Sequence, residues 1–202
     1  MQQELALNEI FFSLKKQWKW IAVSTVAGAL LAFVLSAFIL PKKYTSSLDL
    51  YVNNAERAVG NVNINDINAS QKLVDTYIVI LQDDDVLQQV ADQLSTPMTV
   101  GELSGVISMQ SVNQTEVLQI SAETVSPELS AEICNTLAEI APSVLQRVVK
   151  AGSVEVIGSA KAPRHASSPN VKLNSLLGAL IGLALSVGAS IVIYLLDNTV
   201  KG

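Results

Sequence analysis

The side chains of this chain that could most readily take part in catalysis or metal binding are three consecutive acids, Asp83, Asp84 and Asp85. Their carboxylates could bind a hard cation or form the acidic motif of a sugar-nucleotide transferase. They stand directly before Val86 and Val90, which belong to a helically spaced apolar pattern. Aspartate is a strong N-cap, and acids are stabilised in the first helical turn, so we interpret the run as a helix start. A metal site would need further converging oxygens, and no second motif supplies them.

The single histidine and the single cysteine offer no catalytic pairing. His165 follows Arg164 without a placed carboxylate or nucleophile, which is typical of a solvated loop residue rather than a general base. Cys134 lies in a helical apolar pattern and is interpreted as core packing. No G-x-x-x-x-G-K-[ST] phosphate loop occurs, so this chain by itself is not a P-loop kinase or ATPase. We therefore predict a protein that is not an enzyme and has no cofactor or metal.

Two uncharged apolar runs, 20–41 and 173–196, lie near the ends of the chain and contain 22 and 24 residues. At about 1.5 Å per residue, a helix of either length exceeds the roughly 30 Å hydrocarbon core of a bilayer. The first run is longer than the apolar part of a signal peptide, and no clear small-x-small cleavage site follows it. Trp18 and Trp20 suit the headgroup level. We therefore predict two transmembrane helices, the first an uncleaved anchor.

Two spans place the termini, 1–19 and 197–202, on one side of the membrane and residues 42–172 on the other. Basic residues flank the spans on both sides. A long intervening domain translocates largely regardless of its charge, so the lysines before the first span take priority. We expect a multi-pass protein of the plasma (inner) membrane, with both termini cytoplasmic and an extracytoplasmic central domain.

The central domain is acidic and its membrane ends are basic. Residues 44–160 contain 15 acidic and 4 basic residues. The basic residues that flank the spans on this side are Lys42, Lys43, Lys161, Arg164 and Lys172. Snorkelling and headgroup contact are the favoured interpretation, and attraction of a lipid-linked pyrophosphate or anionic glycan is the alternative. An acidic domain argues against nucleic acid as a partner.

Apolar spacing predicts a domain in the order strand, helices, strand, strand, helix, strand. The expected elements are a strand over 44–52, a loop over 53–66, one kinked or two separate helices over 70–94, a short helix over 99–105, strands over 106–112 and 116–125, a helix over 126–148 and a strand over 153–160. The first and last strands each lead into a span, so we expect them to be neighbours in one sheet. This order predicts one α+β domain of about 120 residues.

Local signals support several of these elements. Thr99 and Glu102 have the form of a capping box, and Ser126 before Pro127 is an N-cap followed by a favoured first helical residue. Pro142 is expected to kink the long helix. The apolar stripe predicted to be buried in that helix comprises Leu129, Ile133, Leu137, Ile140, Val144, Leu145 and Val148. In the last strand, Val154 and Val156 are predicted to face inward, and Gly158 is a further candidate.

A polar strap, residues 161–172, joins the last strand to the second span and contains Pro163 and Pro169. Proline fixes its own φ and biases the preceding residue towards an extended conformation. We therefore predict a stiff path through which the arrangement of the outer domain sets the spacing of the helices beneath it.

Small residues recur every four positions in both spans, a spacing that lets helices approach closely in lipid. The residues are Ser24, Gly28, Ala32 and Ser36 in the first span and Gly178, Gly182, Ser186 and Ser190 in the second. We predict that they pack helices together. The pattern leaves open whether that packing is within one chain or between chains.

The combination resembles the Wzz-type chain-length determinant family, the polysaccharide co-polymerases, and within it the short membrane adaptors of bacterial tyrosine kinases. The resemblance covers essentially the whole chain. It is carried by the segments NEIFFSLKKQWKWI, YTSSLDLYV, TVSPELSAEICNTLAEIAPSVLQRVV, VEVIGSAKAPRHASSPNVKLNSLLGALIG and LLDNTVK. The strap into a glycine-rich span, followed by Asp197, Asn198 and Thr199, is its most specific part. The family often has a third proline in the strap.

This resemblance implies a non-enzymatic ring-like homo-oligomer that regulates the length or export of a capsular or extracellular polysaccharide. It implies a ferredoxin-like α+β fold for the domain between the two transmembrane helices. Its expected partners are a lipid-linked polysaccharide with its polymerase, and a cytoplasmic P-loop tyrosine kinase, separate or fused, that contacts the segment after the second span. An extracytoplasmic ligand sensor with two spans is the alternative. A membrane-bound glycosyl- or phosphotransferase would require an acidic or histidine cluster that is not visible in the sequence.

Overall fold

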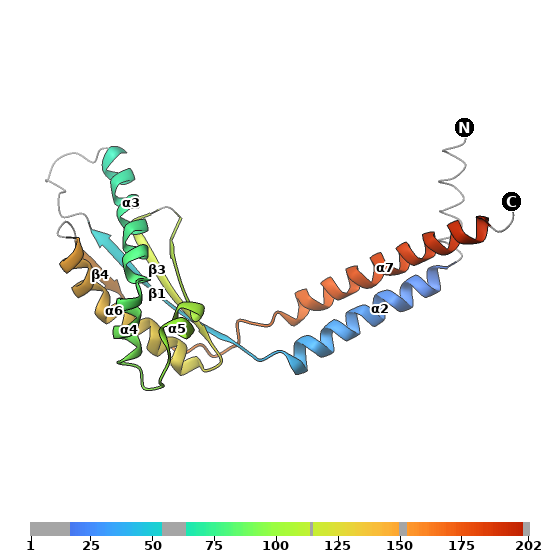
Figure 1. The fold of residues 1–202 in the computed structure, drawn as a ribbon, viewed down its shortest axis with the longest axis horizontal. Helices are drawn as coiled ribbons and strands as arrows, with labels where there is room; N and C mark the ends of the chain where they lie inside the picture. The colour runs from blue at the N-terminus through green and yellow to red at the C-terminus, as the bar shows by residue number, and fades with distance from the viewer. Residues whose placement is uncertain (1–16, 54–63, 114, 150–152, 200–202) are drawn as a thin grey trace. The chain divides into compact units, whose positions relative to one another are not determined.

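The structure, a computed structural model, describes residues 17–53, 64–113, 115–149 and 153–199. The chain divides into two compact units, one made of residues 1–41 and 169–202 and the other of residues 42–168 (Figure 1). The first unit contains the two apolar runs, and the second contains all four strands of the described chain.

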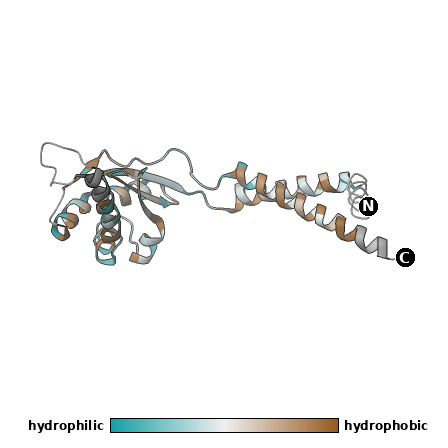
Figure 2. Ribbon diagram, turned by 90° about the horizontal axis from the view of Figure 1, so that it is seen from above, coloured by the Kyte–Doolittle hydropathy of each residue, from teal (hydrophilic) through white to brown (hydrophobic). Residues whose placement is uncertain are grey.

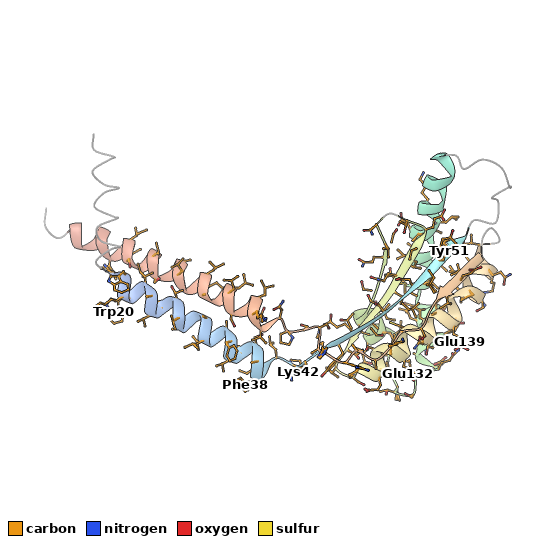
Figure 3. All side chains as sticks on the ribbon, turned by 180° about the vertical axis from the view of Figure 1, so that it is seen from behind. Trp20, Phe38, Lys42, Tyr51, Glu132 and Glu139 are labelled. Atoms are coloured by element: carbon orange, nitrogen blue, oxygen red, sulfur yellow. The ribbon has the colours of Figure 1, made fainter. Side chains whose placement is uncertain are left out.

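The first unit is a hairpin of two helical segments. The first is α2, Trp18–Val34, which continues into the π-helical turn η1, Leu35–Ile39. The second is α7, Val171–Thr199. The candidate spans, Trp18–Ile39 and Val171–Ile193, have mean hydropathies of 2.2 and 2.4 and are long and apolar enough to cross a membrane. Apolar residues predominate along both, with Trp20 and Phe38 towards opposite ends of the first (Figures 2 and 3).

The second unit is built on a four-stranded antiparallel sheet. Its strands are β1, Tyr44–Asn53; β2, Ile107–Ser111; β3, Val117–Thr124; and β4, Ser153–Ile157. They lie in the order β2-β3-β1-β4, with Leu50 of β1 opposite Leu118 of β3 and Val156 of β4. The first and last strands are therefore neighbours, as predicted from the fact that each leads into a span.

In the described residues of this unit, four helices accompany the sheet, so the mixed helix and sheet class is confirmed. They are α3, Ile64–Leu81; α4, Asp84–Ala91; α5, Val100–Val106; and α6, Pro127–Val148. The region 70–94 forms two separate helices. Helix α3 begins at Ile64, earlier than predicted, and β1 extends to Asn53, so both ends of the predicted loop were wrong; residues 54–63 lie outside the described part. Asparagine favours loops locally, yet Asn53 ends β1 and Asn65 lies in α3, so this local preference misplaced both boundaries.

One face of the sheet packs against the helices and forms the core. Helix α6 lies against β1, β3 and β4, and α3 lies against β1, β2 and β3 (Figure 1). Burial alternates along β3, as expected for a strand with one covered face. The largest fully buried side chains in the described residues are Tyr77, Leu50, Leu81, Leu87, Leu103, Leu118, Ile120, Ile133, Leu137, Leu145, Val52 and Val74.

Two apolar residues predicted to be buried are exposed. Val148, the last residue of α6, is 56% exposed. Val156 is 42% exposed because β4 is an edge strand, although its side chain lies on the core face opposite Leu50. Helix α6 contains Pro142 in its interior, and the kink expected there stays a prediction.

Candidate functional site

The acidic run is a helix cap. Asp83 is the N-cap of α4, and its Oδ1 accepts a hydrogen bond of 3.0 Å from the backbone N–H of Asp85. All three carboxylates are exposed, and the carboxylates of Asp84 and Asp85 lie in the first turn, where the helix dipole favours negative charge. Within the described residues, no group of three or more His, Cys, Asp or Glu side chains converges as a metal site would require. The run thus performs the role that the sequence predicted for it.

His165 and Cys134 are far apart in the sequence and lie in different environments, one in solvent and the other in the core. His165 is exposed, in the strap. The thiol of Cys134 is buried in the core and donates to the carbonyl oxygen of Ser46 at 3.4 Å. Burial raises the pKa of Cys134 to about 12, so the thiol stays protonated and cannot act as a thiolate nucleophile at neutral pH.

The two candidate membrane helices, α2 and α7, are in close contact at their glycines. A Cβ added to Gly28 would lie 2.5 Å from the carbonyl oxygen of Gly178, and one added to Gly182 would lie 2.5 Å from that of Ser24. A Cβ on Gly178 would meet both Gly28 and the side chain of Ala32. Only glycine permits this approach, because any side chain would meet backbone atoms that cannot move aside.

Polar side chains join the same helices at two heights. The hydroxyl of Ser24 donates to the carbonyl oxygen of Gly182 at 3.0 Å. Near the other end, the amide of Asn174 donates to the hydroxyl of Ser36, which is buried, at 2.8 Å. In an environment without water, each bond satisfies a group that would otherwise be unpaired. Later residues of α7 thus meet earlier residues of α2, so the helices are antiparallel.

The remaining two residues of the second stripe bond within their own helix. Ser186 donates to the carbonyl oxygen of Leu183, and Ser190 donates to that of Ser186, each at 2.8 Å. Gly188 lies outside the stripe, and a Cβ there would meet nothing within 4 Å. Close helix contact is therefore concentrated at Gly28, Gly178 and Gly182.

The strap is hydrogen-bonded to the beginning of β1. Ser168 accepts from the backbone N–H of Lys43 at 2.9 Å, and the N–H of Ser167 donates back to the Lys43 carbonyl at 2.9 Å. The hydroxyl of Ser46 donates to the carbonyl oxygen of Lys161 at 3.0 Å. The strap around Pro163 therefore runs alongside the start of β1. These hydrogen bonds hold together the two segments, the start of β1 and the strap, that connect the domain to the spans.

Asn135 anchors the upstream end of the strap and was not predicted from the sequence. Its amide oxygen accepts from the Ala160 N–H at 2.8 Å, and its amide nitrogen donates to the Ala160 carbonyl at 3.0 Å. Helix α6 thereby binds the strap through both backbone groups of one buried residue. An asparagine beside a buried helical stripe was the available signal, since a polar residue there requires a partner.

One of the basic residues near the spans is paired. Lys43 Nζ lies 3.2 Å from Glu123 Oε1, with side chains 50% and 41% exposed. Such a half-exposed pair contributes little to stability. Lys42, Lys161, Arg164 and Lys172 are exposed.

Comparison with known proteins places this arrangement in a family. The family model described as "Wzz: Chain length determinant protein" matches residues 3–94. A capsular polysaccharide biosynthesis protein CpsC from Streptococcus agalactiae is 30% identical over 201 residues, which cover 98% of this chain and 87% of the relative. The probable capsular polysaccharide biosynthesis protein YwqC of Bacillus subtilis is 29% identical over 203 residues, which cover 100% of this chain and 82% of the relative.

The chain belongs to the Wzz-type chain-length determinant family. A more distant relative, the capsular polysaccharide biosynthesis protein CapA of Staphylococcus aureus, is 21% identical over 201 residues and also spans the whole chain. These matches run through both spans, the domain and the strap, so the likeness is not confined to apolar segments. In this Wzz-type chain, close contacts join the helical hairpin at its glycines, and backbone hydrogen bonds between Lys43 and the residues Ser167 and Ser168 form what we call the strap clamp.

Proposed function

We propose that the protein is a non-enzymatic regulator of the chain length or export of a capsular or extracellular polysaccharide. The observation that carries this proposal is the similarity, along the whole chain, to relatives named for capsular polysaccharide biosynthesis. The Wzz-type family match supports a role in setting polymer length. Family membership favours this role over the alternative of a two-span ligand sensor.

The proposal places the central domain outside the plasma (inner) membrane and both termini in the cytoplasm. Its partners are the lipid-linked polysaccharide and its polymerase, and a cytoplasmic P-loop tyrosine kinase, separate or fused, that the protein modulates. The order β1, helices, β2, β3, α6, β4 with sheet order β2-β3-β1-β4 supports a ferredoxin-like domain, since two split βαβ units produce this arrangement.

The proposed assembly is a closed homo-oligomeric ring. Because the small-residue stripes of α2 and α7 face one another within one chain, contacts between copies must use other surfaces. Protein extracted in a mild detergent is expected to have a discrete mass of several chains when measured by light scattering coupled to size exclusion. A monomer across several detergents and in nanodiscs would contradict the ring.

The proposed function is tested by deleting the gene in the strain that carries it and measuring the size distribution of the surface polysaccharide. We expect an altered length distribution that the wild-type gene restores. His165→Ala and Asp84→Ala should restore it nearly as well, since these residues have solvated and capping roles. An unchanged distribution in the deletion strain would contradict the function, and complete loss of restoration by either variant, with the protein still inserted, would indicate catalysis.

A further inference from the structure

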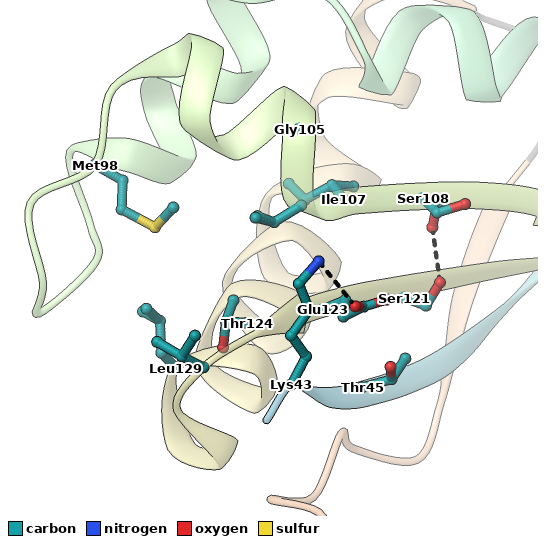
Figure 4. Close-up of a pocket in the computed structure, with 12 residues that line it drawn as sticks. Lys43, Thr45, Met98, Gly105, Ile107, Ser108, Ser121, Glu123, Thr124 and Leu129 are labelled. Carbon is teal, nitrogen blue, oxygen red and sulfur yellow. Dashed lines mark hydrogen bonds and ion pairs between the residues drawn. The ribbon is translucent and has the colours of Figure 1, made fainter. Parts of the chain in front are cut away.

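A pocket of about 440 Å³ lies at one end of the sheet, within the second unit. The start of β1, the start of β2 and the end of β3 meet there with the end of α5 and the beginning of α6 (Figure 4). Its volume is within the range of pockets that hold small organic ligands. None of the roles described above uses it.

The lining of the pocket has two different ends. Met98 and Leu129 lie at one end, and Ile107 lies between them and the polar residues (Figure 4). Ser108, Ser121 and Thr45 lie at the other end. The ion pair between Lys43 and Glu123 stands between the two ends. A ligand that fits must therefore present an apolar surface and several hydrogen-bonding groups at once.

The polar groups of the pocket retain hydrogen-bonding capacity. The Ser121 hydroxyl donates to the Ser108 carbonyl oxygen at 3.2 Å, so its oxygen can still accept. The Lys43 ammonium has three donors, and the Glu123 carboxylate has several acceptor positions, whereas their mutual contact uses one atom of each. Lys43 can donate and Glu123 can accept beside each other. Such a pair suits adjacent hydroxyl groups of a ligand, because each hydroxyl group can both donate and accept a hydrogen bond.

A sugar ring has this combination of groups, with a C–H face for the apolar end and hydroxyls for the polar end. The charge of the pocket lining limits the class of ligand further. Among the described residues, the charged side chains that line the pocket are Lys43 and Glu123, which form an ion pair and cancel each other's charge. A lining without net charge favours a neutral saccharide over an anionic one such as a uronic acid chain.

We propose that this pocket binds a neutral saccharide unit of the polysaccharide whose length the protein regulates. The proposal deepens the proposed function and rests on it. Sugar rings would pack on Met98 and Leu129, and their hydroxyls would bond to Lys43, Glu123 and Ser121. The site is attached along the chain to the strap clamp, because Lys43 contributes its side chain to the pocket and its backbone to Ser167 and Ser168.

Helix α5 offers a matched pair of variants for the test. Gly105 lines the pocket and Gly101 does not, and a Cβ added to either meets nothing within 4 Å. Gly105→Leu and Gly101→Leu therefore make the same chemical change in the same helix, and in neither does the added Cβ meet a neighbouring atom. Only the first places a side chain at the pocket wall. Thermal melts followed by circular dichroism verify that both variants are folded.

The second matched pair removes charge without changing shape. Glu123→Gln alters the pocket, whereas Glu155→Gln alters an exposed carboxylate on β4 that does not line it. All four variants are prepared as full chains in nanodiscs, because detergents with sugar headgroups would compete. The probes are oligosaccharides released by mild acid from the polysaccharide of the strain that carries the gene, separated into neutral and acidic fractions.

Saturation-transfer NMR and calorimetry should detect binding of the neutral fraction to the wild-type chain. Binding at least tenfold weaker in Gly105→Leu and Glu123→Gln, with Gly101→Leu and Glu155→Gln unchanged, supports the proposal. No binding of the neutral fraction, binding of the acidic fraction alone, or equal binding by the Gly105→Leu and Gly101→Leu chains overturns it. Polymer length in the deletion strain is a separate readout: if it changes while the pocket binds nothing, the inference fails and the proposed function stands.

Discussion

At the scale of single residues, Cys134 is the group whose environment departs most clearly from solution chemistry. Its thiol is buried and its pKa is raised to about 12 by desolvation. We expect the folded chain to resist a maleimide at pH 7 and to react at once in denaturant, measured by mass spectrometry. Rapid labelling of the folded protein would contradict the buried assignment.

The same residue has a consequence for stability in alkali. Because the folded pKa lies above the ordinary value of about 9, the folded state retains the thiol proton where the unfolded state loses it. The contribution of Cys134 is therefore fully present below pH ~9 and declines as pH rises between the two pKa values. Replacing Cys134 by Ala should remove this part of the alkaline decline, which pH-dependent urea melts would detect.

At the scale of elements, Gly182 determines how closely α2 and α7 approach. A Leu there would meet the backbone of Ser24, and we expect the packed hairpin to lose about 1–3 kcal/mol, the usual cost of overpacking. Gly188→Leu is the matched control because a Cβ at Gly188 meets nothing within 4 Å.

A cross-link reports the hairpin directly. The side-chain Nδ2 of Asn174 lies 2.8 Å from the Oγ of Ser36. Cysteines in place of these two residues should form a disulfide within one chain when membranes are treated with an oxidant. The yield is expected to fall in the Gly182→Leu background and to persist with Gly188→Leu. Equal yields in both backgrounds would show that the glycine contact does not hold the helices.

Elements with strong local signals were predictable from the sequence. The capping box at Thr99 is present with both of its hydrogen bonds, and Ser126 caps α6. Each signal lies within a few residues of its effect. The start of α3 was not predictable in this way, because its first turns contain Asn65 and Asn68, which are weak helix formers.

The candidate site was less predictable, since its contacts join residues far apart in the sequence. Spacing alone identified the small-residue stripes but could not say which helix each one faces, and the structure pairs Gly28 with Gly178 inside one chain. The bonds between Asn135 and Ala160 and the pocket beside Lys43 arise only when β1, β3 and α6 come together. The periodicity of apolar residues in the sequence does not predict such long-range contacts.

At the scale of the whole molecule, the side of the membrane on which the domain lies is the property that the charges predict least directly, because lysines flank both sides of both spans. The buried thiol of Cys134 makes this property measurable, since the native chain should give no background with a maleimide that cannot cross membranes. Val79 is 70% exposed on α3, so Val79→Cys provides a reactive thiol on the domain. We expect labelling of Val79→Cys in intact cells, and labelling of Ser13→Cys, before the first span, only after the membrane is opened. The reverse pattern would place the domain in the cytoplasm, and a domain there could not contact a polymer growing outside the cell.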